Sequence, residues 1–262
     1  MQQRGFTLLE VITVVVILSI VSTIGGRFMI STIQSYNQTQ TRSKLVNTSR
    51  QAIERMTRQL RGALPYSATL VNGGQCLKFL PVAGGGNYID DVPDSVNGAA
   101  ASGANPNPLV TADHLVDFGS ARYVALGALG AAELYGAGPV SLAALAGRTA
   151  TSLTLANDKV WQRNSINRRF YLLDNPQAFC VSSGELRFYQ NLLVTAEDIP
   201  ALVGACAGAD CSVLANNVSG AANYTLAGGT EDRNTKLTLG LSFVLGGETV
   251  SFNQEVLIRN VP

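Results

Sequence analysis

Cysteine and histidine are the side chains of this chain whose spacing first restricts its chemistry. The sequence has four cysteines, Cys76, Cys180, Cys206 and Cys211, and a single histidine, His114. Zinc sites made of four cysteines usually contain two closely spaced pairs, and here only Cys206 and Cys211 lie close together. In an oxidising compartment, an even set of cysteines forms disulfides by default. We therefore favour Cys206–Cys211, which would close a small loop, and Cys76–Cys180, which would join two predicted strands. We expect no bound metal or cofactor.

The remaining ionisable residues do not form a recognisable catalytic site. His114 has no serine and acid, or cysteine, arranged near it in sequence for nucleophilic catalysis, and we expect it on a loop or the surface. Asp90, Asp91 and Asp94 could supply oxygen ligands to calcium, but their spacing does not fit an EF-hand, so a solvated acidic loop is favoured. Gly84-Gly85-Gly86 lacks the following Lys-Ser/Thr of a phosphate-binding loop. We therefore expect no catalytic residues and no enzyme activity.

Composition indicates one large domain, or one domain with an attachment. The chain has 262 residues, of which 46% are hydrophobic and 14% are charged, and its net charge is +1. The charged share is well below the usual value of about 25%, which argues against a disordered chain. The near-neutral balance argues against a nucleic-acid-binding domain. The hydrophobic excess is uneven, and its position near the N-terminus is informative.

The N-terminal apolar run covers residues 6–24, close to the ~20 residues that a helix needs to cross a bilayer. Its only ionisable side chain, Glu10, would cost on the order of 2.5–3.5 kcal/mol at the bilayer centre, so a specific role or an interfacial position is expected. The run is followed by Gly25-Gly26-Arg27 rather than an Ala-x-Ala site, which disfavours a secretory signal peptide. A plain membrane anchor would explain the length but neither Glu10 nor the Gly5-Phe6 junction.

The octapeptide Arg4-Gly5-Phe6-Thr7-Leu8-Leu9-Glu10-Val11 resembles the type III signal of type IV prepilins and type II secretion pseudopilins. In those families a prepilin peptidase removes a short basic leader after its final glycine, and the new terminal phenylalanine is N-methylated. The resemblance implies a leader of residues 1–5, cleavage between Gly5 and Phe6, and N-methylation of Phe6. It also implies that Glu10 pairs with the N-terminal amine of an adjacent subunit and sets the register of assembly.

The same resemblance implies a cellular location. It places the chain in the inner membrane of a Gram-negative bacterium as a single-pass protein, with its head in the periplasm before assembly and in an extracellular pilus afterwards. Flanking charges favour the opposite orientation, because Arg4 alone precedes the run while Arg27, Arg42, Lys44 and Arg50 follow it. We favour the orientation that the signal implies, since Arg27 is the only positive charge near the end of the segment.

A single proline-free helix is predicted over residues 6–64, and Gly62 and Pro65 supply its stop. If continuous, it would be about 88 Å long at 1.5 Å per residue. Gly25-Gly26 is its weak point, where melting on packing is plausible because each glycine costs about 1 kcal/mol relative to alanine. We therefore divide the chain into a leader, a transmembrane half-helix, an amphipathic half-helix and a head, residues 1–5, 6–30, 31–64 and 65–262.

The second half of this helix is amphipathic. One side of its helical wheel carries the apolar residues Leu45, Ala52, Ile53, Met56, Leu60, Ala63 and Leu64. Six basic residues and one acid lie between Arg42 and Arg61. A solvated face and a contact with acidic surfaces of adjacent subunits both fit this pattern. DNA capture is disfavoured, because aromatic residues are not interleaved with the basic ones.

Beyond Pro65, short alternating apolar segments predict β-strands. Hairpins are predicted from segments 237–245 and 250–258 around Gly246-Gly247, and from segments 179–181 and 186–189 around residues 182–184. Further strands are expected at 76–80 and 170–173, a surface loop at 84–107, and a short helix within 121–150. The predicted fold class is α+β, with the long N-terminal helix packed on one face of an antiparallel sheet in a pilin-like head.

The head also resembles the larger minor pilins, through Tyr171-Leu172-Leu173, the segment 184–189 and the C-terminal segment 256–262. It is most similar to the MshO family of the mannose-sensitive haemagglutinin (MSHA) pilus, and more distantly to the J-type pseudopilins of type II secretion. The resemblance implies a structural subunit with a link to cell adhesion, whose partners are the prepilin peptidase, other major and minor pilins and the inner membrane, but no nucleic acid. A J-type pseudopilin and a membrane-tethered binding domain are the alternatives.

Overall fold

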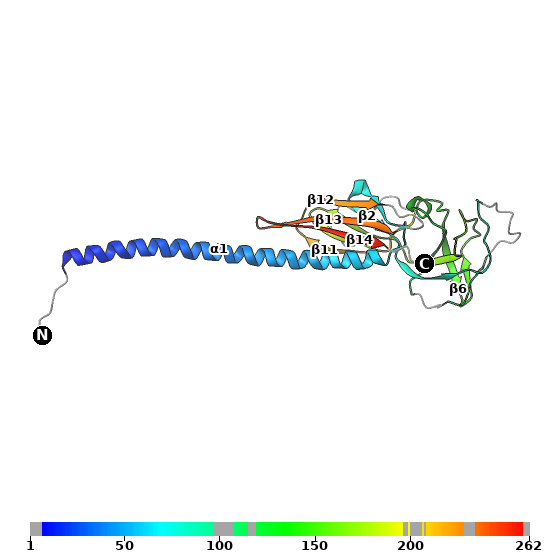
Figure 1. Ribbon diagram of the computed structural model, residues 1–262, viewed down its shortest axis with the longest axis horizontal. Coiled ribbons are helices and arrows are strands. Elements are labelled where there is room, and N and C mark those ends of the chain that lie inside the picture. The colour runs from blue at the N-terminus through cyan, green and yellow to red at the C-terminus, as the bar shows by residue number, and fades with distance from the viewer. Residues whose placement is uncertain are drawn as a thin grey trace.

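The computed structural model describes residues 7–96, 107–114, 119–195, 199, 206, 208–227 and 234–258. One long helix, α1 (Leu8–Arg61), leads into a head made of β-strands (Figure 1). The N-terminal half of α1 projects from the head, and its C-terminal half lies along two β-sheets. A third sheet forms the end of the molecule opposite the N-terminus. The fold is therefore α+β with a pilin-like architecture, as the sequence predicted.

The helix α1 is capped at both ends and has one apolar face. Thr7 is its N-cap residue, and the backbone N–H of Gly62 bonds to the carbonyls of Gln59 and Leu60 at its C-terminal end. The helix thus ends at Arg61, three residues before the predicted end at Leu64, and the predicted glycine Gly62 is its C-cap. Its buried residues recur every three or four positions, as one face of a helix requires, and are Leu45, Ser49, Ala52, Ile53, Met56 and Leu60.

Two antiparallel sheets pack on the C-terminal half of α1, and we call this part the proximal lobe. The first sheet has the strand order β1-β2-β9-β10-β11 and the second β12-β13-β14. A 3-10 helix, η1 (Asn72–Gly74), connects β1 to β2. The strands are β1 (Thr69–Val71), β2 (Cys76–Phe79), β9 (Gln177–Ser182), β10 (Glu185–Tyr189), β11 (Cys211–Asn216), β12 (Val218–Ala227), β13 (Thr235–Leu245) and β14 (Glu248–Ile258).

Both predicted hairpins are present in the proximal lobe. Strands β13 and β14 pair along their whole length around Gly246-Gly247. These glycines have φ angles of 58° and 84°, the left-handed region that a two-residue hairpin turn needs and that glycine adopts at no steric cost. Strands β9 and β10 pair in the same way around Ser183 and Gly184.

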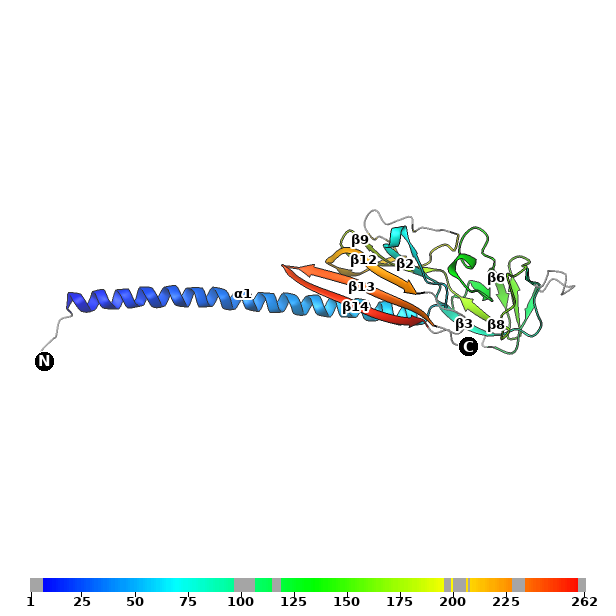
Figure 2. The same cartoon turned by 45° about the horizontal axis from the view of Figure 1, so that its top comes forward.

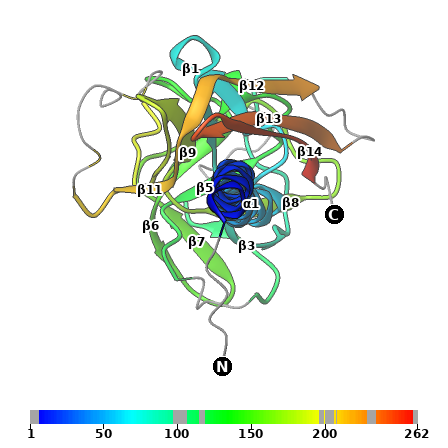
Figure 3. The same cartoon turned by 90° about the vertical axis from the view of Figure 1, so that its left-hand side faces the viewer.

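The core of the proximal lobe lies between α1 and the inner faces of both sheets, which surround the helix on two sides (Figure 3). Alternate residues of β13 are at most 3% exposed: Leu237, Leu239, Leu241 and Phe243. The Phe179 ring lies between those of Phe79 and Phe188, with centroids 5.6 and 5.2 Å away. Met56 and Leu60 of α1 are fully buried against this layer. The core therefore holds the C-terminal half of α1 to the head.

The third sheet forms a distal lobe, which is inserted in the chain between β2 and β9 (Figure 2). Its strand order is β3-β8-β5-β6-β7-β4, and every pairing is antiparallel. It has its own core around Trp161 and Phe170, each at most 1% exposed. Its elements are β3 (Val82–Asn87), β4 (Leu109–Val110), β5 (Tyr123–Leu126), η3 (Ala131–Glu133), β6 (Leu142–Arg148), β7 (Ser152–Leu155) and β8 (Arg169–Leu173).

Two predictions about this region were wrong in part. The start of the expected loop 84–107 belongs to β3, where a Cβ on Gly86 would come within 2.9 Å of the Phe170 ring, so only glycine lets the strand pack there; residues 97–106 lie outside the described part. Segment 170–173 is a strand, β8, as predicted, but it belongs to the separate distal sheet and not to the single antiparallel sheet that was expected. Segment 121–150 does contain a short helix, the three-residue η3, but β5 and β6 form much of the rest.

An apolar cluster at the end of α1 joins the two lobes. Its buried leucines are Leu64, Leu80, Leu134, Leu142 and Leu173. Beside it, the Lys78 ammonium lies 4.4 Å from the centroid of the Tyr135 ring. The Tyr135 hydroxyl donates to the backbone carbonyl of Ser67 at 2.9 Å, and burial raises the pKa of Tyr135, which keeps it a donor. Contacts of both apolar and polar kinds therefore fix the lobes to each other.

A partly buried ion pair holds η3 within the distal lobe. Arg163 donates through both terminal nitrogens to the Glu133 carboxylate, at 2.7 and 2.8 Å. The Ser141 hydroxyl and the Leu129 backbone N–H also donate to this carboxylate. Burial raises the pKa of Glu133, but these hydrogen bonds, led by that from Arg163, outweigh it and lower the pKa below its ordinary value of 4.5.

Replacing Glu133 with glutamine should destabilise the protein near neutral pH and remove part of its acid sensitivity. Because the folded-state pKa is lowered, the stabilisation exists above the unfolded-state value and is lost as the pH falls through the folded-state pKa. We expect a free energy of unfolding lower by about 1 kcal/mol at about pH 7 and unchanged at about pH 3. Thermal unfolding followed by circular dichroism tests this, with Glu54→Gln on the exposed face of α1 as control. An equal deficit at both pH values would contradict it.

Candidate functional site

The segment that carries the predicted processing signal begins α1. Gly5 and Phe6 lie outside the described residues, so cleavage and methylation there stay predictions. The Thr7 hydroxyl accepts a hydrogen bond from the backbone N–H of Glu10 at 3.3 Å and caps the helix. Glu10 therefore lies in the first turn, where the partial positive charge of the helix N-terminus favours a carboxylate by about 0.3–1 kcal/mol.

Side chains of α1 are exposed throughout residues 7–40, although most of the first half is apolar. Ile17 and Phe28, for example, are 60% and 71% exposed. Hydroxyl groups in this half are satisfied within the helix, since Ser19 and Thr23 donate to backbone carbonyls one turn earlier at 2.7 and 2.8 Å. Such internal pairing lets the segment enter an apolar medium without leaving these donors unpaired.

Among the described residues, α1 is the one helix long and apolar enough to span a membrane. Its most apolar window of 18 residues has a mean hydropathy of 2.4, and none of that window is buried in the protein. The core helix of a soluble protein would instead have this face covered. The projecting half of α1 therefore has the composition of a membrane span and the exposure of a segment whose cover comes from outside this chain.

Residues 1–26 match the model of the family described as the prokaryotic N-terminal methylation motif. The chain begins with a type IV prepilin-like signal. The match contains the Gly5-Phe6 junction, Glu10 and most of the exposed apolar run. No curated protein and no solved structure matches the chain. The motif therefore supports a pilin-like or pseudopilin-like protein anchored in the inner membrane.

A basic face follows the apolar half of α1. Its exposed cations are Arg50, Arg58 and Arg61, and the exposed Arg42 and Lys44 precede them along the helix. None of these five cations forms an ion pair with a residue that the structure describes. Arg55, beside them, lies over the Phe188 ring with its guanidinium carbon 5.1 Å from the centroid. Glu54 is the one acid in this part of the helix. The face thus carries uncompensated positive charge next to the base of the head.

The disulfide Cys76–Cys180 links β2 to β9, the two strands between which the distal lobe is inserted. These cysteines are opposite each other in the pairing of the strands, and both are fully buried. Their separation of 104 residues encloses the whole distal lobe. This pairing is one of the two that the sequence favoured, and it closes the base of the insertion.

The second disulfide, Cys206–Cys211, closes a short loop at the start of β11. Next to it, the outer face of the first sheet is covered by a small cluster that contains Tyr189 and Ile199. Arg187 on this face is 3% exposed and donates to Glu185 at 2.9 Å. The described cysteines are thus all bonded, as the sequence favoured, and among the described residues no group of three or more histidine, cysteine or acidic side chains could hold a metal.

The three aspartates considered for calcium do not converge. Asp90 is exposed, and Asp91 pairs with Arg168 at the surface at 3.1 Å. Asp94, expected in a solvated loop, is instead 2% exposed and accepts from the side-chain amide of Asn164 at 2.6 Å. Asp94 can be buried because the hydrogen bond from the Asn164 amide compensates its carboxylate for the lost hydration.

His114 lies against the edge of the distal sheet, where its Nδ1 is 3.0 Å from the Thr111 hydroxyl and its ring meets the edge of Phe170. It was expected on a loop or the surface, and it follows β4 without belonging to a strand.

Sequence reasoning missed a different set of residues: Tyr66, Arg169 and Tyr171, which line a cavity between the lobes. No motif marks them, but the aromatic residue directly after the predicted Gly62–Pro65 stop was a usable signal.

Replacing both Cys76 and Cys180 with alanine should destabilise the head much more than the same change at Cys206 and Cys211. The first crosslink spans 104 residues and the second spans 5. In the chain-entropy model, a loop of about 100 residues is worth about 4.7 kcal/mol, and short loops are worth less. Urea unfolding of the full-length protein in detergent, followed by tryptophan fluorescence of Trp161, measures both variants. Equal losses in the free energy of unfolding would show that the crosslink around the distal lobe stabilises the protein no more than the short one does.

Proposed function

We propose that this protein is a minor pilin-like subunit of a type IV pilus of the MSHA kind, similar to the MshO family. The observation that carries the proposal is a methylation motif at residues 1–26 placed at the start of a helix whose side chains are exposed through residue 40. In this proposal the prepilin peptidase removes residues 1–5, residues 6–30 anchor the chain, residues 31–64 complete the stem, and residues 65–262 form a head in the periplasm.

Assembly then moves the exposed apolar helix from lipid to a bundle of similar helices. Cleavage after Gly5 would create an α-amino group at Phe6, which is cationic near neutral pH. The Glu10 carboxylate lies in the first helical turn, within one turn of that new terminus. In an apolar bundle an uncompensated charge is costly, so the carboxylate of one subunit and the amine of the next stabilise only the register that pairs them.

The size and position of the distal lobe favour the tip of the filament. This lobe extends the head at the end farthest from the projecting helix (Figure 1). A subunit at the tip has no neighbour beyond that end, so the added lobe meets no steric barrier there. In such a role the protein starts a filament and presents its head outward, which fits a link to cell adhesion and needs no catalytic activity.

The basic face of α1 suggests how the stem meets its neighbours. Arg42, Arg50 and Arg58 are exposed and have no acidic partner among the described residues. A neighbouring pilin that presents carboxylates at this level would neutralise them, whereas nucleic acid is disfavoured by the lack of aromatic stacking residues along the face.

Two other functions keep some support from the same observations. A J-type pseudopilin of type II secretion would use the same signal, anchor and helix bundle, and it differs in the machine that it joins. A membrane-tethered binding domain would keep the anchor and the head but would form no filament. The methylation motif favours the minor pilin and the pseudopilin over the tethered domain, because a tethered domain has no need of a processed N-terminus.

Mass spectrometry of the protein purified from membranes tests the processing step. We expect a mature chain that lacks residues 1–5 and starts at N-methylated Phe6, with all four cysteines oxidised. Changing Gly5 to alanine should leave the leader attached, because the peptidase of this family cuts after glycine. A mature protein that keeps Met1 in the presence of an active prepilin peptidase would contradict the prepilin interpretation.

Replacing Glu10 with valine should leave the protein in the membrane but exclude it from filaments. Losing one member of a buried charge pair costs about 3–5 kcal/mol, so incorporation should fall by well over about tenfold. Immunoblots of sheared filaments and of inner membranes measure both outcomes in the producing bacterium. Glu54→Gln, on the exposed face farther along α1, is the matched control and should assemble normally. Equal amounts of the Glu10 variant and wild type in the filaments would remove the proposed register role.

A further inference from the structure

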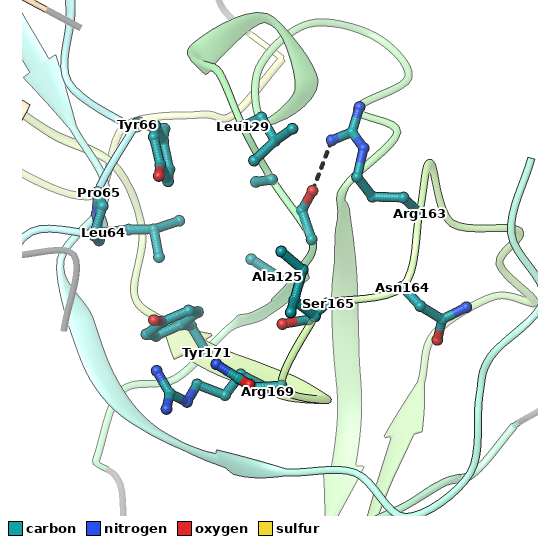
Figure 4. Close-up of a pocket in the computed structure, with 14 residues that line it drawn as sticks. Leu64, Pro65, Tyr66, Ala125, Leu129, Arg163, Asn164, Ser165, Arg169 and Tyr171 are labelled. Carbon is teal, nitrogen blue, oxygen red and sulfur yellow. Dashed lines mark hydrogen bonds between the residues drawn. The ribbon is translucent and has the colours of Figure 1, made fainter. Parts of the chain in front are cut away.

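A cavity of about 160 Å³ lies where the end of α1 meets the distal lobe. In Figure 4, Tyr66 and Tyr171 lie above and below Leu64 on one side of the cavity. Leu129 and Ser165 lie on the opposite side, and Arg169 runs beneath Tyr171. Leu64 and Ala125 add apolar surface to its walls. The cavity thus combines an aromatic and aliphatic lining with a cation at its margin.

The turn that supplies Tyr66 is held in an uncommon conformation. Tyr66 has a φ of 68°, in the left-handed region that bulky side chains rarely adopt. Hydrogen bonds on both sides hold it there: the Leu64 N–H donates to the Leu80 carbonyl at 2.8 Å, and the Ser67 hydroxyl donates to the Leu64 carbonyl at 2.7 Å. A strained residue that its surroundings fix in place is typical of a functional position. Here the strain keeps an aromatic ring over the cavity.

Charges around the cavity leave one arginine uncompensated. Arg163 forms a bidentate pair with Glu133, and Arg168 pairs with Asp91. Arg169 is half-buried, and it forms no ion pair with any carboxylate of the described residues. A half-buried guanidinium loses part of its hydration, so an anion within its reach would bind with a favourable electrostatic contribution.

We propose that this cavity binds a small organic carboxylate with an apolar, ring-sized body. The volume matches one ring, since a cavity of about 150 Å³ accommodates benzene. The body would pack against Leu64 and the rings of Tyr66 and Tyr171, and the carboxylate would accept hydrogen bonds from Arg169. Ser165, whose hydroxyl points toward the cavity in Figure 4, would supply a further donor. This site is independent of filament assembly and does not rest on the proposed function.

Neither a bare anion nor a neutral ring satisfies the whole cavity. Inorganic phosphate would meet Arg169 but leave the apolar walls of Leu64, Ala125 and Leu129 uncovered. A neutral ring would fill those walls but leave the guanidinium without a counter-charge. A ligand that has both parts covers the apolar surface and compensates the charge, which is the basis for its selection.

Fluorine NMR of para-fluorobenzoate with the full-length protein in dodecylmaltoside micelles tests the proposal. We expect saturable line broadening beyond that in empty micelles, and binding about tenfold weaker for para-fluorobenzyl alcohol, which lacks the charge. Inorganic phosphate in excess should not displace the probe. Arg169→Gln should weaken benzoate binding by about tenfold or more. Arg122→Gln, an exposed arginine of the same lobe away from the cavity, should bind as wild type does.

A second variant removes the space and keeps the charge. Ala128 lines the cavity and is partly buried, so Ala128→Leu should fill it and abolish probe binding while the unfolding midpoint stays near that of wild type. If Arg169→Gln and Ala128→Leu both bind the probe as wild type does, the probe enters the micelle and not the cavity, and the proposal fails. It also fails if the alcohol binds as tightly as benzoate, or if phosphate displaces the probe.

Discussion

The structure depends on a single helix that needs two different surroundings. From Leu45 onward, α1 places its apolar face against the two proximal sheets, where Met56 and Leu60 are fully buried. Before that point its apolar side chains have no cover within the chain. Each exposed Val, Leu or Ile would gain about 1.5–3 kcal/mol on full burial, so the projecting half strongly favours lipid or other helices over water. The core of the head therefore uses only the C-terminal half of the helix.

The Gly5-Phe6 junction and Glu10 could be recognised from sequence because they lie in one short, ordered motif. The two hairpins were predictable for a similar reason: strict alternation of apolar residues and a Gly-Gly or Ser-Gly turn are local signals. The division of the head into three sheets was not predictable. Strand β3 contains Val-Ala-Gly-Gly-Gly-Asn, which has no alternation, and its partner is β8, more than 80 residues later in the chain, where Phe170 packs over Gly86.

The interlobe cavity and the buried Asp94 were not predictable from the sequence either. Asp94 and Asn164 are 70 residues apart in sequence, and only the fold shows that one compensates the other. Tyr66 comes from the turn after α1, and Tyr171 and Arg169 come from β8; neither segment has a recognisable binding motif. Sequence patterns report on faces of single elements, whereas cavities and buried charge networks depend on how distant elements meet. The disulfide between Cys76 and Cys180 was favoured only because both cysteines lay on predicted strands.

That disulfide also settles how the distal lobe is connected to the stem. The chain enters the lobe from β2, a strand of four residues whose outer neighbour β1 has three, and it returns through β9. Hydrogen bonds alone give so short a strand little resistance to being pulled out of the sheet. The crosslink joins β2 to β9, and β9 pairs with β10, whose Leu186 and Phe188 belong to the core around α1. Load on the distal lobe therefore reaches the helix through a covalent link and a packed core, and does not depend on the pairing of β1 with β2.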